Sequence, residues 1–166
     1  MIPDFRADED AIATVVGAAP DVFAHNLETV RRLHGVVRRG FSYDRSLEVL
    51  RLAKQMRPDQ VTKAGMILGM GETDAEVRDA IGDLRAMDVD LLTLGQYLSP
   101  SRAHPVVDRY VTPETFDELG GFARGLGFKH VTSGPLVRSS YHAREQEAAA
   151  TAERPRGASG FRTGRC

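Results

Sequence analysis

The sequence predicts an α/β fold in which helices alternate with the strands of a parallel sheet. Four strand-like segments near residues 21, 61, 90 and 128 are separated by segments with helical spacing of apolar residues, which is the rhythm of βαβ units. Two helix starts carry strong local signals, because Thr73 and Glu76 form a capping box and Thr112 precedes a proline. Such sheets either close into barrels or stay open and doubly wound, and both forms place functional residues after the carboxyl ends of the strands.

The expected elements follow one another along most of the chain. Helices are expected at residues 8–17, 27–37, 44–56, 73–87 and 112–127, and strands at 21–24, 61–68, 90–94 and 128–132. Asn26 is placed to cap the second helix. The long connection after the third strand is typical of functional loops or of disorder, and Val106 and Val107 within it favour order. Ile2 to Phe5 look like the exit of a strand whose earlier residues are missing, although an ordinary extended segment fits as well.

Composition narrows the class of protein. The 166 residues suffice for one domain with a buried core, and the formal net charge of −1 gives no whole-chain electrostatic footprint for nucleic acid or an anionic membrane. No apolar run reaches the ~18–20 residues that cross a bilayer, and the first residues lack the plan of a secretory signal. A soluble, cytoplasmic protein is expected. The single cysteine, Cys166, excludes an internal disulfide and a thiolate-held metal cluster made by this chain alone.

Polar residues after the first two expected strands are candidate site residues. His25, Asn26 and Glu28 follow the first strand, and the glycine-containing turn 65–72 ends the second. Glycines there allow the backbone to approach a flat or phosphorylated ligand, and the next helix offers free N–H groups. The turn matches neither a P-loop nor a dinucleotide-binding fingerprint. Taken alone, it is more simply a tight structural turn, and Asn26 is more simply a helix cap.

The segment Arg138-Ser139-Ser140-Tyr141-His142 follows the last expected strand. A serine hydrolase site is disfavoured, because the chain has no Gly-x-Ser-x-Gly elbow and no acidic motif lies nearby. From residue chemistry alone, a helix cap formed by Ser139 or Ser140 is the simplest interpretation. After Ala143 the composition shifts to Glu, Ala, Arg and Gly, which predicts a short helix that fades into a disordered tail.

Five segments taken together, in this order and spacing, resemble lipoyl synthase, a family of radical S-adenosylmethionine enzymes. They are residues 25–29, 65–72, 92–98, 109–113 and 138–142. The run Leu-Thr-Leu-Gly-Gln-Tyr-Leu at 92–98 and the run Arg-Ser-Ser-Tyr at 138–141 are specific to that family, whereas the glycine-containing strand is shared more loosely with other radical enzymes. The second of these runs also disfavours another branch, biotin synthase.

The resemblance implies a fold and an activity. The fold is part of a (βα) barrel, a partial TIM barrel of the radical SAM type whose amino-terminal strands are missing. Residues 1–145 would form the carboxy-terminal part of that barrel, and 146–166 a disordered tail. The activity is that of a sulfurtransferase, which inserts two sulfur atoms into a protein-bound octanoyl chain to form the lipoyl cofactor. The partner is then an octanoylated lipoyl carrier domain or H-protein.

The resemblance also implies cofactors and site residues. One [4Fe-4S] cluster cleaves S-adenosylmethionine, and a second, auxiliary [4Fe-4S] cluster donates sulfur. Ser140 matches the family's oxygen ligand to the auxiliary cluster, a harder ligand than thiolate. Arg138 would orient this segment or pair with a carboxylate. The residues expected to hold S-adenosylmethionine are Asn26, Glu28, Gly65, Gly69 and Glu72.

The cysteines are the main departure from the family. The family's two motifs, Cys-x4-Cys-x5-Cys and Cys-x3-Cys-x2-Cys, lie upstream of the matching region, and neither occurs here. The isolated chain is therefore expected to bind neither cluster and to be inactive. A fragment, a gene with a displaced start, and one half of a split enzyme whose partner chain supplies the amino-terminal half all fit. A non-catalytic remnant or binding module that docks the octanoylated carrier domain is the alternative from a different class.

Overall fold

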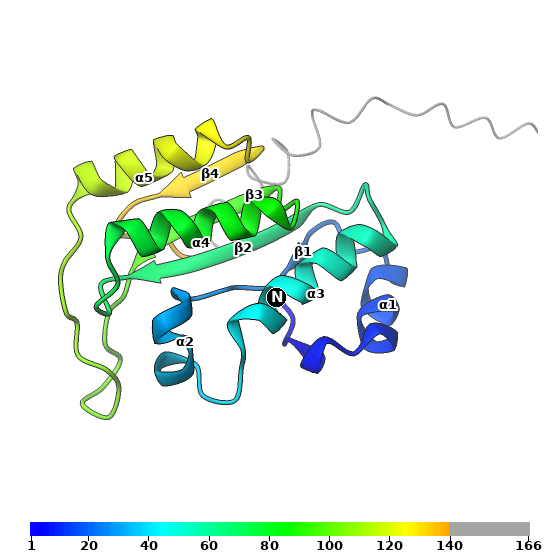
Figure 1. Ribbon diagram of the computed structural model, residues 1–166, viewed down its shortest axis with the longest axis horizontal. Coiled ribbons are helices and arrows are strands. Elements are labelled where there is room, and N and C mark those ends of the chain that lie inside the picture. Colours follow the sequence, from blue (N-terminus) through cyan, green and yellow to red (C-terminus); the bar gives the residue numbers. More distant parts are fainter. Residues whose placement is uncertain (140–166) are drawn as a thin grey trace, which may run out of the picture.

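The computed structural model describes residues 1–139, and these form a parallel sheet with helices packed on one side (Figure 1). The strands are β1 (Phe23–Ala24), β2 (Thr62–Leu68), β3 (Leu91–Gln96) and β4 (His130–Ser133), paired in chain order and all parallel. The helices are α1 (Glu9–Gly17), α2 (Arg31–Val37), α3 (Tyr43–Met56), α4 (Asp74–Ala86) and α5 (Pro113–Gly125), preceded by a 3-10 helix, Phe5–Ala7. The expected α/β fold is confirmed, and the sequential order of the strands is that of part of a (βα) barrel.

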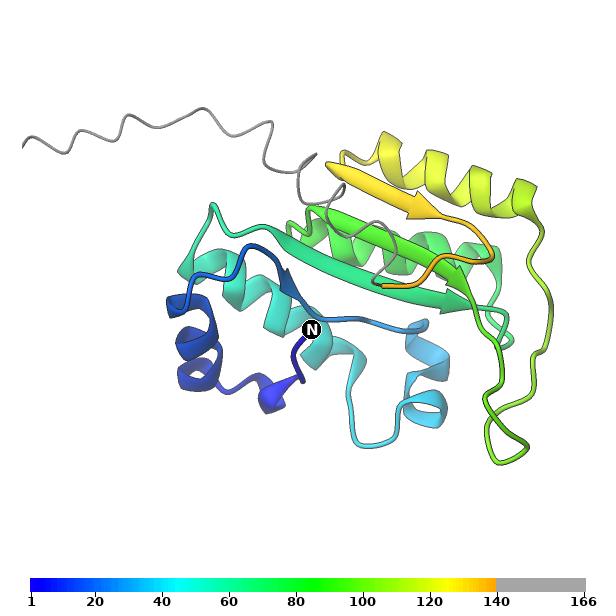
Figure 2. The same ribbon diagram turned by 180° about the vertical axis from the view of Figure 1, so that it is seen from behind.

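The two faces of the sheet have different environments. On β2, Ala64, Met66 and Leu68 join the apolar core that packs under the helices. Successive side chains of a strand point to opposite faces, so the residues between them point away from the helices. We call this second side the interior face; it carries Lys63, Gly65 and Ile67 of β2 and, in register with them, Leu91, Thr93 and Gly95 of β3. Seen from behind, this face is crossed by the segment that follows β4 (Figure 2).

Two helices begin where local signals place them. At the start of α4, the Thr73 hydroxyl accepts a hydrogen bond from the Glu76 amide (3.2 Å), and the Glu76 carboxylate accepts one from the Thr73 amide (2.9 Å). At the start of α5, the Thr112 hydroxyl accepts a hydrogen bond from the Thr115 amide, and Pro113 is the first helical residue. Both predicted caps are confirmed.

The predicted helix 27–37 is wrong at its amino end, because α2 begins only at Arg31 and Asn26 does not cap it. The backbone after β1 instead continues along β2. The amides of Leu27 and Glu28 both donate to the Gly65 carbonyl, and the Ile67 amide donates to the Glu28 carbonyl. Glu28 has a φ of +70°, a left-handed conformation that interrupts a helix. Long-range pairing with β2 therefore replaces the local helical bonds.

The ends of the chain bear on two further expectations. Ile2 donates one backbone hydrogen bond to the Ala24 carbonyl (2.9 Å) before the chain turns into the 3-10 helix, and the structure assigns no strand to residues 2–5. The predicted tail, residues 146–166, lies outside the described residues.

Within residues 1–139, no helix is both long enough and apolar enough to cross a membrane.

Candidate functional site

A cavity of about 220 Å³ opens on the interior face. Four parts of the chain meet there: the first residue, the residues after β1, the strands β2 and β3, and the segment after β4. The lining residues are Met1, Asn26, Glu28, Gly65, Met66, Ile67, Thr93, Gly95, Val137, Arg138 and Ser139. Four of the predicted site residues, Asn26, Glu28, Gly65 and Arg138, are thus brought together.

Gly65 allows the first part of this wall to form. A Cβ atom at this position would lie 2.8 Å from the Thr93 hydroxyl and 2.9 Å from the Asn26 carbonyl oxygen Oδ1, both too close for ordinary contact. Because Gly65 has no side chain, the polar groups of β3 and of the segment after β1 converge over β2. The Asn26 amide then donates to the Glu28 carboxylate at 3.2 Å. The result is an amide and a carboxylate held side by side at one end of the cavity.

Arg38 holds the backbone of the segment that carries Asn26 and Glu28. Its Nη1 donates to the Asn26 backbone carbonyl at 2.7 Å, and its guanidinium stacks 4.1 Å from the centre of the Phe41 ring. Burial lowers the pKa of Arg38, and the attraction of the nearby Glu28 carboxylate opposes that shift. Arg38 lies directly past the end of α2, and its side chain is turned inward.

The segment after β4 closes the other end of the cavity. The Gly134 amide donates to the Leu94 carbonyl at 3.1 Å. A Cβ atom on Gly95 would collide with the carbonyl oxygen of Val137, so the segment lies directly on β3. The Arg138 guanidinium donates to that same Val137 carbonyl at 2.7 Å, and among residues 1–139 no carboxylate pairs with it. Within the described residues, the guanidinium of Arg138 therefore contacts the local backbone.

Lys63 anchors the same segment and was not singled out from the sequence. Its ammonium group donates to the Ser139 carbonyl at 2.6 Å, its residue is 6% exposed, and burial lowers its pKa. A lysine within an otherwise apolar strand is the signal that could have identified it, since charged residues are seldom buried without a partner. Ser140, Tyr141 and His142 lie outside the described residues.

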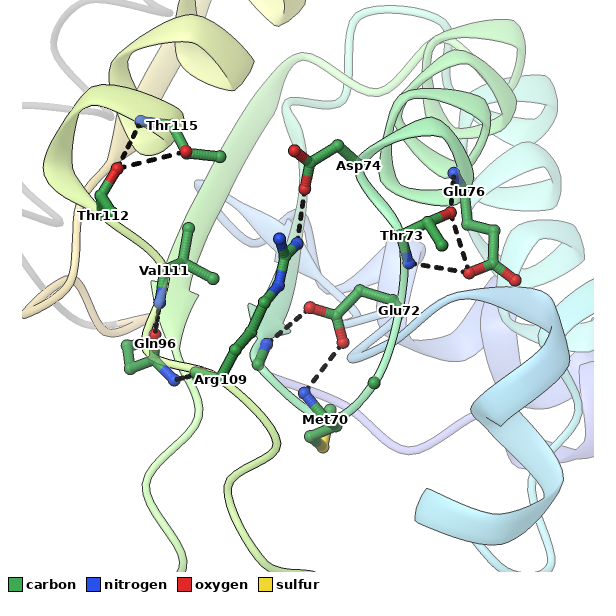
Figure 3. Close-up of polar contacts among 12 residues, drawn as sticks. Met70, Glu72, Thr73, Asp74, Glu76, Gln96, Arg109, Val111, Thr112 and Thr115 are labelled. Atoms are coloured by element: carbon green, nitrogen blue, oxygen red, sulfur yellow. Dashed lines mark hydrogen bonds and ion pairs between the residues drawn. The ribbon is translucent and has the colours of Figure 1, made fainter.

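Gly69 and Glu72 lie apart from the cavity, in the turn between β2 and α4. The Glu72 carboxylate accepts hydrogen bonds from the amides of Gly69 (2.6 Å) and Met70 (2.9 Å), so its oxygens brace the turn (Figure 3). Gly69 has a φ of +105°, and a Cβ atom there would collide with the Gln96 side chain and the Arg109 carbonyl. Glu72 therefore holds its own turn, and Gly69 lets the loop after β3 approach that turn, so the arrangement supports a structural contribution from each.

Metal ligands are scarce in this arrangement. Among residues 1–139 no group of three or more His, Cys, Asp or Glu side chains is placed to hold a metal ion. The whole chain contains one cysteine, Cys166, which is fewer than an iron–sulfur cluster needs. What the described cavity offers is a carboxylate, an amide, an arginine and a close backbone approach, a set suited to a polar organic ligand rather than to a cluster.

Comparisons of the sequence with a family model and with individual proteins agree with each other. The model of the radical SAM superfamily matches residues 1–84. The chain is 56% identical over 151 residues to lipoyl synthase 2 of Thermosynechococcus vestitus, which covers 87% of this chain and 52% of that protein. It is 53% identical over 154 residues to the lipoyl synthase of Symbiobacterium thermophilum (93% and 48%), and 50% identical over 162 residues to that of Rubrobacter xylanophilus (98% and 49%). The chain spans about half the length of the curated relatives it matches.

Proposed function

The chain belongs to the radical SAM superfamily, and from that membership we propose that it supplies part of a cytoplasmic lipoyl synthase. The reaction would insert two sulfur atoms into an octanoyl chain carried by a lipoyl carrier domain or H-protein. The observation that carries the proposal is the cavity at Gly65 of β2, where Asn26 and Glu28 from the segment after β1 meet Arg138 from the segment after β4. These segments are the ones in which the resemblance to lipoyl synthase lies, and the identity of 50–56% to three proteins of that name extends over most of the chain.

The cavity residues fit a portion of S-adenosylmethionine. The Glu28 carboxylate suits a cationic or hydroxyl-bearing group, and the Asn26 amide supplies both donor and acceptor atoms. Gly65 lets the Thr93 hydroxyl and the Asn26 side-chain oxygen converge over β2, where they add polar groups for such a ligand. When bound, S-adenosylmethionine is the source of the radical that abstracts hydrogen in this family. The contribution of the chain's own residues is to bind the molecule and to orient it against β2 and β3.

The residues present do not fit the two [4Fe-4S] clusters. Ser140 is the proposed oxygen ligand to the auxiliary cluster, but one serine and one cysteine cannot hold a cluster. The remaining ligands would have to come from outside this sequence, either from residues encoded upstream or from a partner chain that supplies the amino-terminal half. For this reason we propose that the isolated chain is inactive.

The cysteine content also favours a second candidate function for the isolated chain. A binding module that docks the octanoylated carrier domain needs no iron, and its requirements are an ordered surface and a partner. The two candidates differ in what they predict for a complete enzyme built from this chain. The first requires the cavity to work in catalysis, whereas the second does not.

A chimera tests the proposal. Residues 1–145 would replace the matching segment of the lipoyl synthase of Thermosynechococcus vestitus, and lipoyl formation on an octanoylated carrier would be followed by mass spectrometry. We expect the chimera to lipoylate the carrier, and the Ser140→Ala chimera to lose activity while keeping its fold. An inactive but folded chimera with intact clusters would contradict the enzymatic proposal and favour the binding module.

A further inference from the structure

The connection between β3 and α5 presents apolar side chains to solvent next to basic ones. Val106 is 82% exposed and Tyr110 is 73% exposed. The end of α2 lies beside this connection and adds Val36, which is 67% exposed. We call the resulting surface the rim patch, and its members are Val36, Arg39, Arg102, His104, Val106 and Tyr110. Isolated exposed valines are common, but a group of them around shared hollows is typical of interaction surfaces.

Two shallow hollows of about 500 and 530 Å³ run through the rim patch and share His104. Neither hollow is lined by an aspartate or a glutamate, although acidic residues slightly outnumber Lys and Arg in the whole chain, by 23 to 22. The sole acidic residue of the sequence between Tyr97 and Val111 is Asp108. Its carboxyl carbon lies 3.8 Å from where a Cβ atom of Gly71 would be, so it is directed toward the turn before α4. Arg39 and Arg102 therefore give the hollows a positive field.

Hydrogen bonds fix the backbone of the connection between β3 and α5 that carries most of the rim patch. The Gln96 side chain donates to the Arg109 carbonyl (3.1 Å) and accepts from the Val111 amide (2.9 Å), and Arg109 pairs with Asp74 of α4 at 2.5 Å (Figure 3). Higher in the loop, the Tyr97 hydroxyl donates to the Pro105 carbonyl at 2.9 Å. These bonds order the backbone that displays Val106 and Tyr110. A surface ordered before binding loses less conformational entropy when a partner docks.

We propose that the rim patch docks an acidic protein domain, and, resting on the proposed function, that this domain is the octanoylated carrier. Acidic groups on the partner complement Arg39 and Arg102, while apolar groups cover Val36 and Val106. The exposed aliphatic side chains Val36 and Val106 suit a protein better than a nucleic acid, whose backbone offers charge and no apolar contact. The connection that displays the patch leaves β3 at Gln96, one residue after Gly95, which lines the cavity, so the docking surface and the cavity share β3 as their support.

Binding of the octanoylated carrier domain to the purified full chain tests this inference. Fluorescence anisotropy of a labelled carrier would be measured with the wild type, with the double variant Arg39→Glu/Arg102→Glu, and with Val106→Ser. We expect the double variant to weaken binding about tenfold and Val106→Ser about threefold, with the loss for the double variant shrinking at high salt. Arg124→Glu, an exposed arginine of α5, is the matched control and should bind as the wild type does. Circular dichroism confirms that each variant is folded.

Several results would overturn the proposal. They are absence of carrier binding by the wild type, unchanged binding by the double variant, and an equal loss in Arg124→Glu. Preferential binding to phosphatidylglycerol vesicles would assign the patch to a membrane, and a dimer in sedimentation that the double variant abolishes would assign it to a second copy of the chain. The assay involves neither a cluster nor S-adenosylmethionine. A failed chimera with intact carrier binding would therefore reject the enzymatic proposal alone, and the reverse result would reject the docking surface alone.

Discussion

The ammonium group of Lys63 donates a 2.6 Å hydrogen bond to the carbonyl oxygen of Ser139, which joins the start of β2 to the segment after β4. This bond and the contact between Gly95 and the Val137 carbonyl are two fixed points of the same segment. A charge-assisted bond in a buried place is stronger than one in water, because solvent competes less for either group. The two contacts together fix the backbone immediately before Ser140.

Gly95→Ala should displace that segment. The new Cβ atom meets a backbone carbonyl, that of Val137, which cannot rotate away as a side chain would. We expect a loss of about 1–3 kcal/mol in the free energy of unfolding, the usual cost of overpacking, and faster amide hydrogen exchange in residues 134–139. Gly82→Ala is the matched control, because a Cβ atom at that position of α4 meets nothing within 4 Å. That control should be neutral or stabilising by up to ~1 kcal/mol, and a similar loss in both variants would contradict the argument.

Asp90→Asn should destabilise the fold more than a surface substitution does. The Asp90 side chain is 5% exposed and accepts hydrogen bonds from Lys54 (2.6 Å) and from the Thr62 amide (2.8 Å), and it pairs with Lys129 (2.9 Å). Burial alone would raise its pKa, but these bonds outweigh that effect and lower it. Removing the charge leaves Lys54 buried without its counterion, so we expect a loss of about 3 kcal/mol in urea unfolding.

The control for that substitution lies two residues away. Asp88→Asn breaks only the ion pair with Arg85, in which the Asp88 side chain is 70% exposed. Asparagine also tolerates the left-handed backbone found there, with φ of +62°. We expect a change below about 0.5 kcal/mol, since exposed pairs contribute little. Equal effects at Asp90 and Asp88 would show that the buried network does not stabilise the sheet.

The unfolding free energy should fall as the pH drops from about 7 to 5, and His25 should account for part of the fall. His25 is fully buried, with Nδ1 3.0 Å from the Ile2 carbonyl, and burial lowers its pKa below the usual 6.5. The folded protein therefore keeps the ring neutral in a range where the unfolded chain binds a proton, so acid favours unfolding. His34 shows a shift in the same direction. Urea unfolding of His25→Gln at pH 7.5, 6.5 and 5.5 should give a shallower slope than the wild type, and an identical slope would refute the assignment.

Features held by hydrogen bonds between residues close in sequence could be predicted from the sequence, whereas features held by contacts between distant segments could not. The cap at Thr73 was predictable, because its hydrogen bonds join residues three apart in sequence. The cap at Asn26 was not, because the amides after it bond to Gly65 of a distant strand, and single-sequence patterns do not report such pairing. Asn26 and Glu28 were still selected as site residues by the rule that sites follow the strands of parallel sheets. The part played by Lys63 depends on where the segment after β4 crosses the sheet, which no local pattern encodes.

Glu28→Gln should weaken binding of S-adenosylmethionine if the cavity holds that molecule. The substitution keeps the size of the side chain and its oxygen acceptor for the Asn26 amide, but removes the negative charge that suits a cationic ligand. We expect about a tenfold loss of affinity in equilibrium dialysis, the usual order for one charge-assisted bond. Glu48→Gln, which disrupts an exposed ion pair with Arg51 on α3, is the control and should bind as the wild type does. If Glu28→Gln and Glu48→Gln bind equally well, the ligand lies elsewhere, and Gly65 then serves only to let β3 and the segment after β1 approach each other.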